Sequence, residues 1–348
     1  MKTAAHNAPT REITTMQAIV QDRYGEAGDV LRLEETGRPA IGDGEVLLRV
    51  HAAGVDRGVW HLMTGLPYPV RLAGYGVRAP KTRVRGREVA GRVEAIGKDV
   101  TSFQVGDEVF GIAEGAFAEY ACAQPGKLAR RPESLTAVQA AAVPVSALTA
   151  LQAVRDHGHV HAGQKVLVIG ASGGVGTFAV QIAKAYGAEV TGVCSTAKTD
   201  LVRSVGADHV IDYTRAGIAD GAQRYDVIID IGGNRPLRQL RGVLARRGTL
   251  VIVGGETGGR WLGGFDRSLR APVLSRFVPQ RLAAVIVSEN AADLLVLTQL
   301  IESGQVKPVL TAIMRWARPM TRCSTMPARC GNITPVSMRA SPPCRSRN

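Results

Sequence analysis

The sequence predicts an α/β protein in which a partly open β-barrel, or a sandwich, is followed by a doubly wound parallel sheet. The chain has 348 residues, and compact cores stop growing near about 250 residues, so we expect two domains. Short runs with alternating apolar and polar residues fill the first third, whereas Val- and Ile-rich runs alternate with helical segments later. The first pattern is typical of half-buried antiparallel strands and the second of parallel strands joined by helices.

The first part of the chain is predicted to be β-structure, because Gly, Pro and Asp recur as turn residues between short β-type runs. These runs are AIVQ (18–21), EVLLRVHAAGV (45–55), EVAGRVEAIG (88–97), GDEVFGI (106–112) and AFAEYACA (116–123). After Pro132 the apolar period changes, and SLTAVQAAAVPVSALTALQAV predicts two helices separated by Pro144. We expect a domain boundary near this point.

The second part is predicted to be a parallel sheet, because its runs are apolar throughout, as strands buried on both faces require. The expected strands are KVLVIG (165–170), EVTGVC (189–194), HVI (209–211), DVIIDI (226–231), GTLVIVGG (248–255) and RLAAVIV (281–287). The expected helices, joined to them by right-handed crossovers, are 174–186, 198–205, 214–222 and 235–246, with an amphipathic helix near 290–303. The predicted domains are 141–287 for the parallel sheet, and 16–140 with 288–348 for the other.

Composition argues against several classes of protein. No apolar run approaches the length of about 18 residues that a membrane span needs, and the first residues, MKTAAHNAPTREITT, lack the apolar segment of a secretory signal. The five cysteines form no CxxC pair, which argues against a disulfide framework or a structural zinc site. We therefore predict a cytoplasmic protein without a membrane partner.

The net charge of +13 is concentrated near one end of the sequence. Residues 1–310 hold 36 basic and 30 acidic residues, whereas residues 311–348 hold seven arginines and no acid. The body of the protein therefore carries only +6. The arginines of the tail are irregularly spaced and not clustered with lysines, so no nucleic-acid partner is predicted.

A glycine-rich turn carries the strongest local signal. Gly170-Ala171-Ser172-Gly173-Gly174-Val175-Gly176 follows a predicted strand and begins a predicted helix. Small residues let backbone N–H groups approach a pyrophosphate at the positive end of the helix dipole, and the last glycine lets the helix pack closely on the sheet. Because further strand–helix units follow, this context predicts a dinucleotide-binding site.

The end of the second parallel strand bears on which dinucleotide binds. A free ribose 2′-hydroxyl usually meets an Asp or Glu there, but this strand ends at Cys194-Ser195-Thr196, with Lys198 just beyond. Glu189 opens the strand and lies several residues away, at about 3.3 Å each. Hydroxyls and a lysine without an acid suit a 2′-phosphate, so NADPH (NADP+) is predicted. The alternative is that Lys198 is a solvated residue at a helix start.

A series of motifs occurs in order between about residues 16 and 310. They are the AIV strand, GRVEAIGKDVTSFQVGDEVFG, AAAVPVSALTALQAV, GASGGVGTFAVQIAKAYGAEVTGV, GADHVIDY, DVIIDIGGN, GTLVIVGG and LIESGQVKPV. The series resembles the medium-chain dehydrogenases/reductases, and within them the zinc-independent, quinone-oxidoreductase-like branch. The resemblance implies a GroES-like, partly open β-barrel as catalytic domain, a Rossmann domain for NADPH, and a homodimer.

The resemblance also implies roles for residues outside the glycine turn. Ser195, Lys198 and Tyr213 would surround the 2′-phosphate of NADPH. Thr149, Gly254 and Gly255 would lie near the nicotinamide, and the cleft between the domains would take the substrate.

The residues argue against a catalytic zinc. Zinc-dependent relatives of this family use a Cys in the segment that resembles GVDRGVWHLMTG and a His in a Gly-His-Glu element, where this chain has Asp56 and Gly86-Arg87-Glu88. Arginine cannot ligate zinc, and no Cys/His cluster elsewhere supplies three ligands. The prediction is a site without metal.

Without a metal, polarisation of the substrate must come from hydrogen bonds or water. Many relatives carry Asn where this chain has Asp56, and an ionised Asp accepts a hydrogen bond but donates none. His61 and Tyr68 are the next candidates as general acids, although each is equally consistent with packing. Asp56, His61 and Tyr68 are therefore the candidate catalytic residues.

A basic segment precedes the Gly-Arg-Glu element. It contains Arg71, Arg78, Lys81, Arg83 and Arg85 without an acid. Such a segment is more often a solvated face than an anchor for substrate, and we predict a solvated loop.

The sequence departs from the family pattern after about Leu310. Four of seven Met, five of 17 Pro and three of five Cys follow residue 310, and no acid follows Glu302. The codons of residues 329–344 can also be read in another frame, in which each codon begins at the third base of the present one. That frame admits an ending such as Met-Arg-Glu-His-His-Ala-Gly-Glu-His-Ala-Gly-Lys-Pro-Ala-Val, which resembles that of the family. We hypothesise that the tail is read in a shifted frame from between about 310 and 318, with an uncovered apolar surface and an unpaired sheet edge as consequences.

Together these observations predict a zinc-independent, alcohol dehydrogenase-like oxidoreductase that transfers a hydride from NADPH to a quinone, an enone or a related small electrophile. The alternative is an NADPH-binding sensor, or redox-responsive partner, without turnover.

Overall fold

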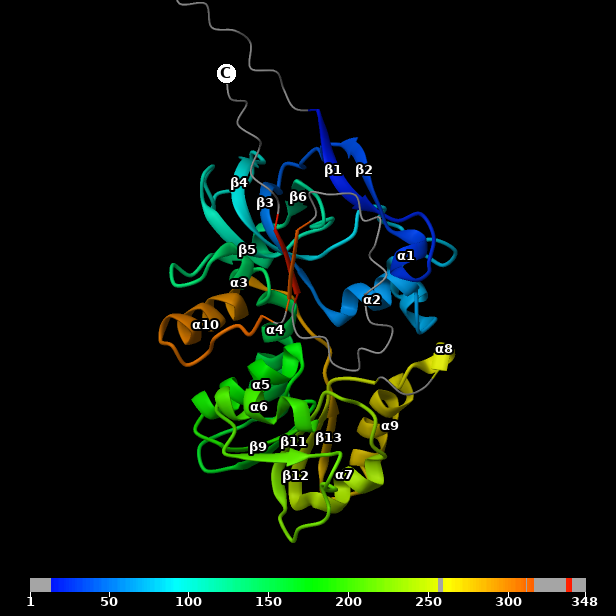
Figure 1. Cartoon of the computed structure of the whole chain (residues 1–348), viewed down its shortest axis with the longest axis vertical. Coiled ribbons are helices and arrows are strands. Elements are labelled where there is room, and N and C mark those ends of the chain that lie inside the picture. The colour runs from blue at the N-terminus through cyan, green and yellow to red at the C-terminus, as the bar shows by residue number, and fades with distance from the viewer. Residues whose placement is uncertain (1–13, 256–258, 311, 316–335, 340–348) are drawn as a thin grey trace, which may run out of the picture.

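The computed structural model describes residues 14–255, 259–310, 312–315 and 336–339. The described chain forms two lobes along its long axis (Figure 1). One, the barrel lobe, carries strands β1–β7, and the other, the parallel-sheet lobe, carries β8–β13. This confirms the predicted combination of an antiparallel barrel with a parallel sheet.

The barrel lobe is built around β3, which pairs with β4, β6 and β15. Its sheet has the order β14-β15-β3-β4-β5-β7, and β1 and β2 form a separate antiparallel pair. Val46, Leu48 and Val50 of β3 alternate into a core shared with Val89 and Val109 of the neighbouring strands. The strands and helices are β1 (Thr15–Val20), α1 (Ala27–Val30), β2 (Arg32–Gly37), β3 (Val46–Val55), α2 (Arg57–Thr64), β4 (Glu88–Ile96), β5 (Glu108–Ile112), β6 (Tyr120–Ala123) and β7 (Leu128–Arg130).

Two helices follow the barrel, as Pro144 predicts. The first, α3 (Ala137–Ala140), begins with a capping box between Thr136 and Gln139, and the second, α4 (Pro144–Gln152), has Pro144 in its first turn. Proline is tolerated there because the first N–H groups of a helix have no intrahelical partner. All residues of α4 except Val145 are buried, because the helix lies between the two lobes (Figure 1).

The parallel-sheet lobe has the strand order β10-β9-β8-β11-β12-β13. Alternate residues of β8 face opposite helical layers: Val166 and Val168 share a core with Phe178, whereas Leu167 and Ile169 share one with Leu240. The two buried faces explain why the strands are apolar throughout. The elements are β8 (Lys165–Ile169), α5 (Gly174–Ala185), β9 (Glu189–Cys194), α6 (Thr199–Ser204), β10 (His209–Asp212), β11 (Tyr225–Asp230), α7 (Leu237–Val243), β12 (Leu244–Ile252), α8 (Gly259–Leu262), α9 (Phe265–Ser275), β13 (Arg281–Ala284) and α10 (Ala291–Glu302).

The helix expected at 214–222 is wrong, since this stretch forms turns. The side chains of Asp212 and Asp220 accept hydrogen bonds from the backbone N–H groups of Thr214 (2.9 Å) and Gly217 (2.5 Å). Local bonds of this kind offer the backbone an alternative to the helix. The other predicted helices occur, most of them shorter at an end.

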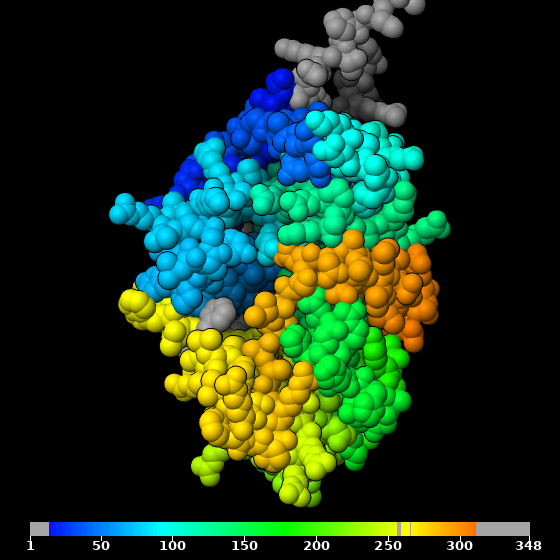
Figure 2. All heavy atoms as spheres, turned by 180° about the vertical axis from the view of Figure 1, so that it is seen from behind, coloured from blue at the N-terminus to red at the C-terminus, as the bar shows by residue number. Residues whose placement is uncertain are grey.

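The lobes also meet along a second contact. On the face shown in Figure 2, the yellow residues after 259 meet the blue segment that carries α2. The backbone N–H of Tyr68 donates to the carbonyl of Arg260 (2.9 Å), and the Tyr68 ring packs edge-on against Trp261. No helix of the described residues is long and apolar enough to cross a membrane.

Two short strands belong to the tail, β14 (Ala312–Arg315) and β15 (Val336–Arg339). β15 pairs antiparallel with β3, so that Val336 is level with Val55 and Arg339 with Ala52. The expected unpaired edge is therefore wrong along this stretch of β3, because backbone N–H and C=O groups of the tail complete the ladder. The other residues of the predicted shifted frame, 311, 316–335 and 340–348, lie outside the described residues.

Candidate cofactor and substrate site

The glycine-rich turn lies at the carboxyl end of β8, where the strand order reverses between β8 and β11. Gly170 has φ +85°, a left-handed conformation that favours glycine. A Cβ on Gly176 would lie 2.1 Å from the carbonyl oxygen of Gly170, so the first turn of α5 can approach β8 this closely only with glycine. Crevices at such switch points are where ligands bind in open α/β sheets.

The turn also leaves polar groups free for a ligand. Gly173 precedes α5 and supplies no side-chain cap, so the first N–H groups of the helix are not satisfied by a side chain. The Ser172 side chain is buried, and its Oγ has no hydrogen-bond partner among the described residues. An unpaired hydroxyl beside the positive end of a 12-residue helix fits a phosphate group.

Residues after β12 come to the same edge of the sheet. Gly254 donates its N–H to the carbonyl of Asp230 (3.3 Å), and a Cβ on Gly233 would lie 2.5 Å from the Gly254 carbonyl oxygen. A Cβ on Gly170 would in turn lie 3.1 Å from the backbone N of Gly232. The turns after β8, β11 and β12 therefore pack against one another, which brings Gly254 and Gly255 close to the glycine-rich turn.

The tips of β9 and β10 hold Ser195, Thr196, Lys198 and Tyr213. Thr196 Oγ1 donates to Asp212 (2.5 Å) and lies 2.9 Å from Thr214 Oγ1, and the half-exposed Tyr213 donates its N–H to the Cys194 carbonyl (3.0 Å). The hydrogen bond from Thr196 holds the pKa of Asp212 below its usual range.

Sequence reasoning missed Asp212, because it ends the third parallel strand and not the second. The register places it level with Cys194. The signal was present in GADHVIDY, since neighbouring parallel strands end at the same edge of a sheet.

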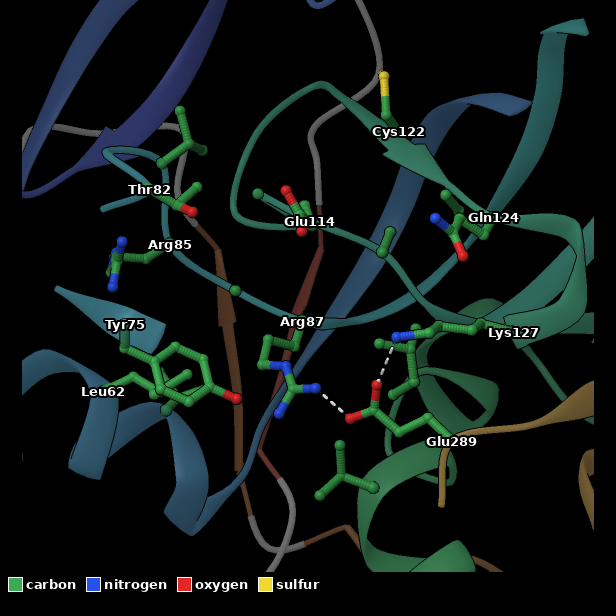
Figure 3. A pocket seen from close by; sticks show the side chains of 18 of the residues that line it. Leu62, Tyr75, Thr82, Arg85, Arg87, Glu114, Cys122, Gln124, Lys127 and Glu289 are labelled. Carbon is green, nitrogen blue, oxygen red and sulfur yellow. Dashed lines mark hydrogen bonds and ion pairs between the residues drawn. The ribbon is translucent and has the colours of Figure 1, made fainter. Parts of the chain in front are cut away.

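A cavity of about 940 Å³ lies between the barrel lobe and α4 (Figure 3). Val59 and Leu62 of α2, Thr149 of α4 and the charged residues Arg87 and Glu289 line it. Thr149 Oγ1 donates to the Val145 carbonyl (2.6 Å). Among the predicted cofactor residues, Thr149 is thus the one that lines this cavity, while the others lie at the carboxyl edge of the parallel sheet.

Asp56 is the N-cap of α2 and does not line the cavity. Its Oδ1 accepts hydrogen bonds from the backbone N–H groups of Gly58 (2.5 Å) and Val59 (3.3 Å), while its buried Oδ2 has no hydrogen-bond partner among the described residues. Burial raises the pKa of Asp56, and the nearby charge of Arg87 opposes this rise. Helix capping thus accounts for the hydrogen bonds of Oδ1 but gives no role to Oδ2.

His61 and Tyr68 also lie outside the cavity lining. The His61 Nδ1 lies 2.7 Å from the carbonyl oxygen of Leu66, so the ring donates to it when Nδ1 carries the proton. Burial lowers the pKa of His61, which favours the neutral ring. Arg71 lies over the Tyr68 ring, 4.9 Å from its centroid. The structure thus brings none of the three candidate acids into the described lining of the cavity.

Sequence reasoning did not predict the ionic network that crosses the cavity. Arg87 and Lys127, both from the barrel lobe, pair with Glu289, which follows β13; the Lys127–Glu289 distance is 3.0 Å (Figure 3). The position of Arg87 in the site could have been predicted, because Gly86-Arg87-Glu88 stands where zinc-dependent relatives have Gly-His-Glu. Its partner could not be predicted, because Glu289 is about 200 residues away in the sequence.

Glu88 is fully buried next to Arg87. Its Oε1 accepts a hydrogen bond from the backbone N–H of Val145 (2.8 Å), so it caps α4, which lacks a side-chain cap of its own. Burial raises the pKa of Glu88 well above its ordinary value, and the neighbouring Asp56 carboxylate adds to this rise. Arg87, directly before β4, thus lines the cavity, and Glu88, the first residue of β4, caps the helix that carries Thr149.

Among the described residues, no three His, Cys, Asp or Glu side chains gather in a group that could hold a metal ion. The zinc-independent site remains a prediction.

The barrel lobe and the parallel-sheet lobe together define a medium-chain dehydrogenase/reductase. Residues 42–133 match the family model of the alcohol dehydrogenase GroES-like domain, and residues 174–266 match that of the zinc-binding dehydrogenases. The quinone oxidoreductase of Pongo abelii is 34% identical over 249 residues, which are 69% of this chain and 73% of the relative. The chain belongs to the quinone oxidoreductase-like branch of this superfamily.

Two further comparisons agree. The mitochondrial NAD(P)H oxidoreductase RTN4IP1 of Mus musculus is 38% identical over 243 residues, 64% of this chain and 61% of the relative's length. The structure of the quinone oxidoreductase from Coxiella burnetii superposes with a TM-score of 0.78 at 26% identity, covering 94% of this chain and all of that one.

Proposed function

We propose that the protein is an NADPH-dependent oxidoreductase that reduces a quinone, an enone or a related small carbonyl compound. The observation that carries the proposal is the glycine-rich turn, in which Gly170 and Gly176 permit a close approach and Ser172 has no partner among the described residues. When bound, the nicotinamide supplies the hydride. Medium-chain family membership and the names of the relatives support this chemistry.

The residues of this chain would bind and orient the reactants. The N–H groups of α5 would hold the pyrophosphate, Gly254, Gly255 and Thr149 would lie along the nicotinamide, and the apolar side chains of Val59 and Leu62 would exclude water from the cavity. Holding the reactants in this way contributes several kcal/mol to catalysis, on the order of 7–11 at most.

The proton for the reduced substrate needs a donor or a water. Asp56, His61 and Tyr68 remain candidates, although none lines the cavity. Tyr75 is the phenol of the described lining, and its hydroxyl points towards Arg87 in Figure 3. We add Tyr75 as a candidate general acid, and comparison of Tyr75→Phe with Tyr68→Phe separates the two: the acid is the tyrosine whose loss lowers kcat about 100-fold or more.

The test of the proposed function is NADPH oxidation against a panel of quinones, enones and aldehydes. We expect turnover with at least one class. Gly176→Ala should abolish cofactor binding, because its Cβ would meet the Gly170 carbonyl, whereas Gly242→Ala, which meets no atom within 4 Å, is the matched control. Tight NADPH binding without turnover on any substrate would favour the alternative, a sensor or redox-responsive partner.

The preference for NADPH is a separate proposal, supported by Lys198 and the hydroxyls at the tip of β9. Asp212 is the competing group, since an acid at this edge suits the 2′-hydroxyl of NADH. Lys198→Ala should raise the KM for NADPH about tenfold and leave that for NADH unchanged. No change in either KM would mean that Lys198 is a solvated residue, and an equal rise in both would mean that it contacts a part that the two cofactors share.

We also propose a homodimer. Leu269 and Val273 of α9 and the following Phe277 lie four residues apart and are exposed, next to β13, which ends the parallel sheet in the described part of the chain. A strand with a free edge and an adjacent apolar helix face are suited to pairing with a second copy. Light scattering should give twice the chain mass, and Leu269→Lys with Phe277→Lys should give the monomer.

The cytoplasm stays the predicted compartment, although the mouse relative is described as mitochondrial. Microscopy of the tagged chain in its own cell tests this.

A further inference from the structure

Arg85 contradicts the predicted solvated loop. Its side chain lines the cavity, and the residue is only 8% exposed. Arg83, two residues earlier, is exposed and pairs with Asp22 (2.7 Å) and Glu34 (2.9 Å). The alternation of β-type backbone turns one arginine outward to two acids and the other inward to the cavity.

The guanidinium of Arg85 has no ion pair or hydrogen bond among the described residues, and its buried Nε is without a partner there. Burial lowers its pKa, because the charged guanidinium loses contact with water. An arginine nevertheless stays protonated at neutral pH. The protein thus keeps a positive charge at the cavity wall that no group pairs with in the described structure.

The lining contains three acids, Glu45, Glu114 and Glu289, and none of them pairs with Arg85 in the described structure. Glu289 is bound by Arg87 and Lys127, and Glu45 accepts the backbone N–H of Gly42 (2.8 Å). Figure 3 shows Arg85 with Thr82 and Tyr75 at one end of the cavity, and Lys127 with Glu289 at the other. Lys81, a further cation, also lines the cavity. The lining thus holds four cations against three acids and keeps a net positive charge, and Arg85 is a cation without an ion pair in the described structure.

Burial of an unpaired charge costs free energy, and such a group is retained where a ligand pairs with it. We propose that the Arg85 end of the cavity binds an anionic group, a carboxylate or a phosphate, of the substrate. The planar guanidinium matches either group with two parallel hydrogen bonds. The inference rests on the proposed function, and it makes the substrate a small electrophile that carries a negative charge apart from its reducible carbonyl.

Binding tests the site without turnover. Sodium acetate and inorganic phosphate are titrated separately against the full chain without cofactor, and its melting temperature is measured at constant ionic strength. At least one anion should stabilise the wild type more than Arg85→Met, because phosphate also fits the glycine-rich turn in both proteins. Which anion gives the difference distinguishes a carboxylate site from a phosphate site. Equal stabilisation of both proteins, or of neither, would overturn the proposal.

Turnover tests the role in specificity. The acid 4-oxo-2-pentenoate and its methyl ester differ in one charge and share the enone. Arg85→Met should raise KM for the acid about 30-fold and change that for the ester less than twofold, while Arg83→Met, the control on the same segment, should change neither. If neither compound is reduced, the proposed function fails for this enone, and the anion titration still decides the site.

The melting temperature of Arg85 variants distinguishes an unpaired charge from one that has a partner within the protein. Replacing an unpaired buried charge by an apolar side chain of similar length should leave the melting temperature equal or raise it. A clear fall for Arg85→Met, restored in Arg85→Lys, would show that Arg85 has a structural partner and would contradict the inference.

Discussion

At the scale of single residues, the same side-chain type serves different ends according to its surroundings. The sequence predicts Asp56 as a group facing substrate, yet the structure uses it to begin α2. It predicts Arg85 as solvated, yet Arg85 is buried. Residue type and spacing could not distinguish these outcomes, because burial depends on strands and helices that are distant in the sequence. The glycine turn could be predicted, since its contacts are local.

The capping role of Asp56 predicts how its variants behave. Asp56→Asn keeps an oxygen that accepts the N–H groups of Gly58 and Val59, so we expect unchanged stability and helix content. Asp56→Ala loses the cap and should lower the free energy of unfolding by about 1 kcal/mol. Urea unfolding measures both. If Asp56→Asn keeps its stability but loses kcat, the carboxylate has a chemical role in addition to the cap.

Glu88 predicts a dependence of stability on pH. Because its pKa is raised in the folded state above the ordinary value of 4.5, the folded protein favours the protonated carboxyl. The contribution is present below pH 4.5 and is lost as the pH rises through the folded pKa.

Glu88→Gln keeps the acceptor for Val145 without the charge. We expect it to be more stable than the wild type at pH 8, by roughly 1 kcal/mol or more, and the difference to shrink towards pH 4. Denaturant unfolding over this range measures it. A difference independent of pH would mean that the pKa of Glu88 is the same in the folded and unfolded states, because the Arg87 charge compensates its burial.

At the scale of elements, the parallel sheet was the most predictable part. Four helical connections were expected between its strands, three of them occur, and the error at 214–222 arises where Asp212 and Asp220 bond locally to the backbone. Strands buried on both faces are read from composition alone, whereas polar connections depend on individual side-chain hydrogen bonds. The contact of β15 with β3 was not predicted, because no apolar pattern in the tail indicated it.

The buried ion pair between β11 and α9 predicts how changes to either partner affect the stability of the fold. Asp230 at the end of β11 accepts from Arg267 of α9 (2.5 Å), and both are buried. Asp230→Ala leaves the guanidinium without that partner and should lower stability by about 3–5 kcal/mol. The double change Asp230→Leu with Arg267→Met removes both charges and should recover most of the loss. Thermal unfolding tests this; an uncorrected loss in the double variant would mean that Asp230 acts through its bond to Gly233 (3.1 Å).

At the scale of the whole molecule, ion pairs of Glu289 and hydrogen bonds of Gln152 fix the position of one lobe relative to the other. Glu289 accepts from two barrel-lobe cations, and Gln152 of α4 donates to the Ser288 carbonyl (2.8 Å) and to Asp293 (2.7 Å). The segment 287–293 is thus the joint at which the chain returns from the parallel sheet to the barrel. The cavity lies at this joint, so its shape depends on the relative position of the lobes.

The shifted-frame hypothesis predicts that a chain with an ending of family type is more stable than this one. Seven arginines and no acid among residues 311–348 account for more than half of the net charge, and like charges destabilise a compact state. A gene in which the frame is changed between codons 310 and 318 should encode an ending of family type. The protein made from it should melt several degrees higher at low salt, with a smaller gain at high salt, where repulsion is screened. Sequencing of the coding DNA comes first. If neither other frame encodes such an ending, the tail is native, and the pairing of β15 with β3 belongs to the native fold.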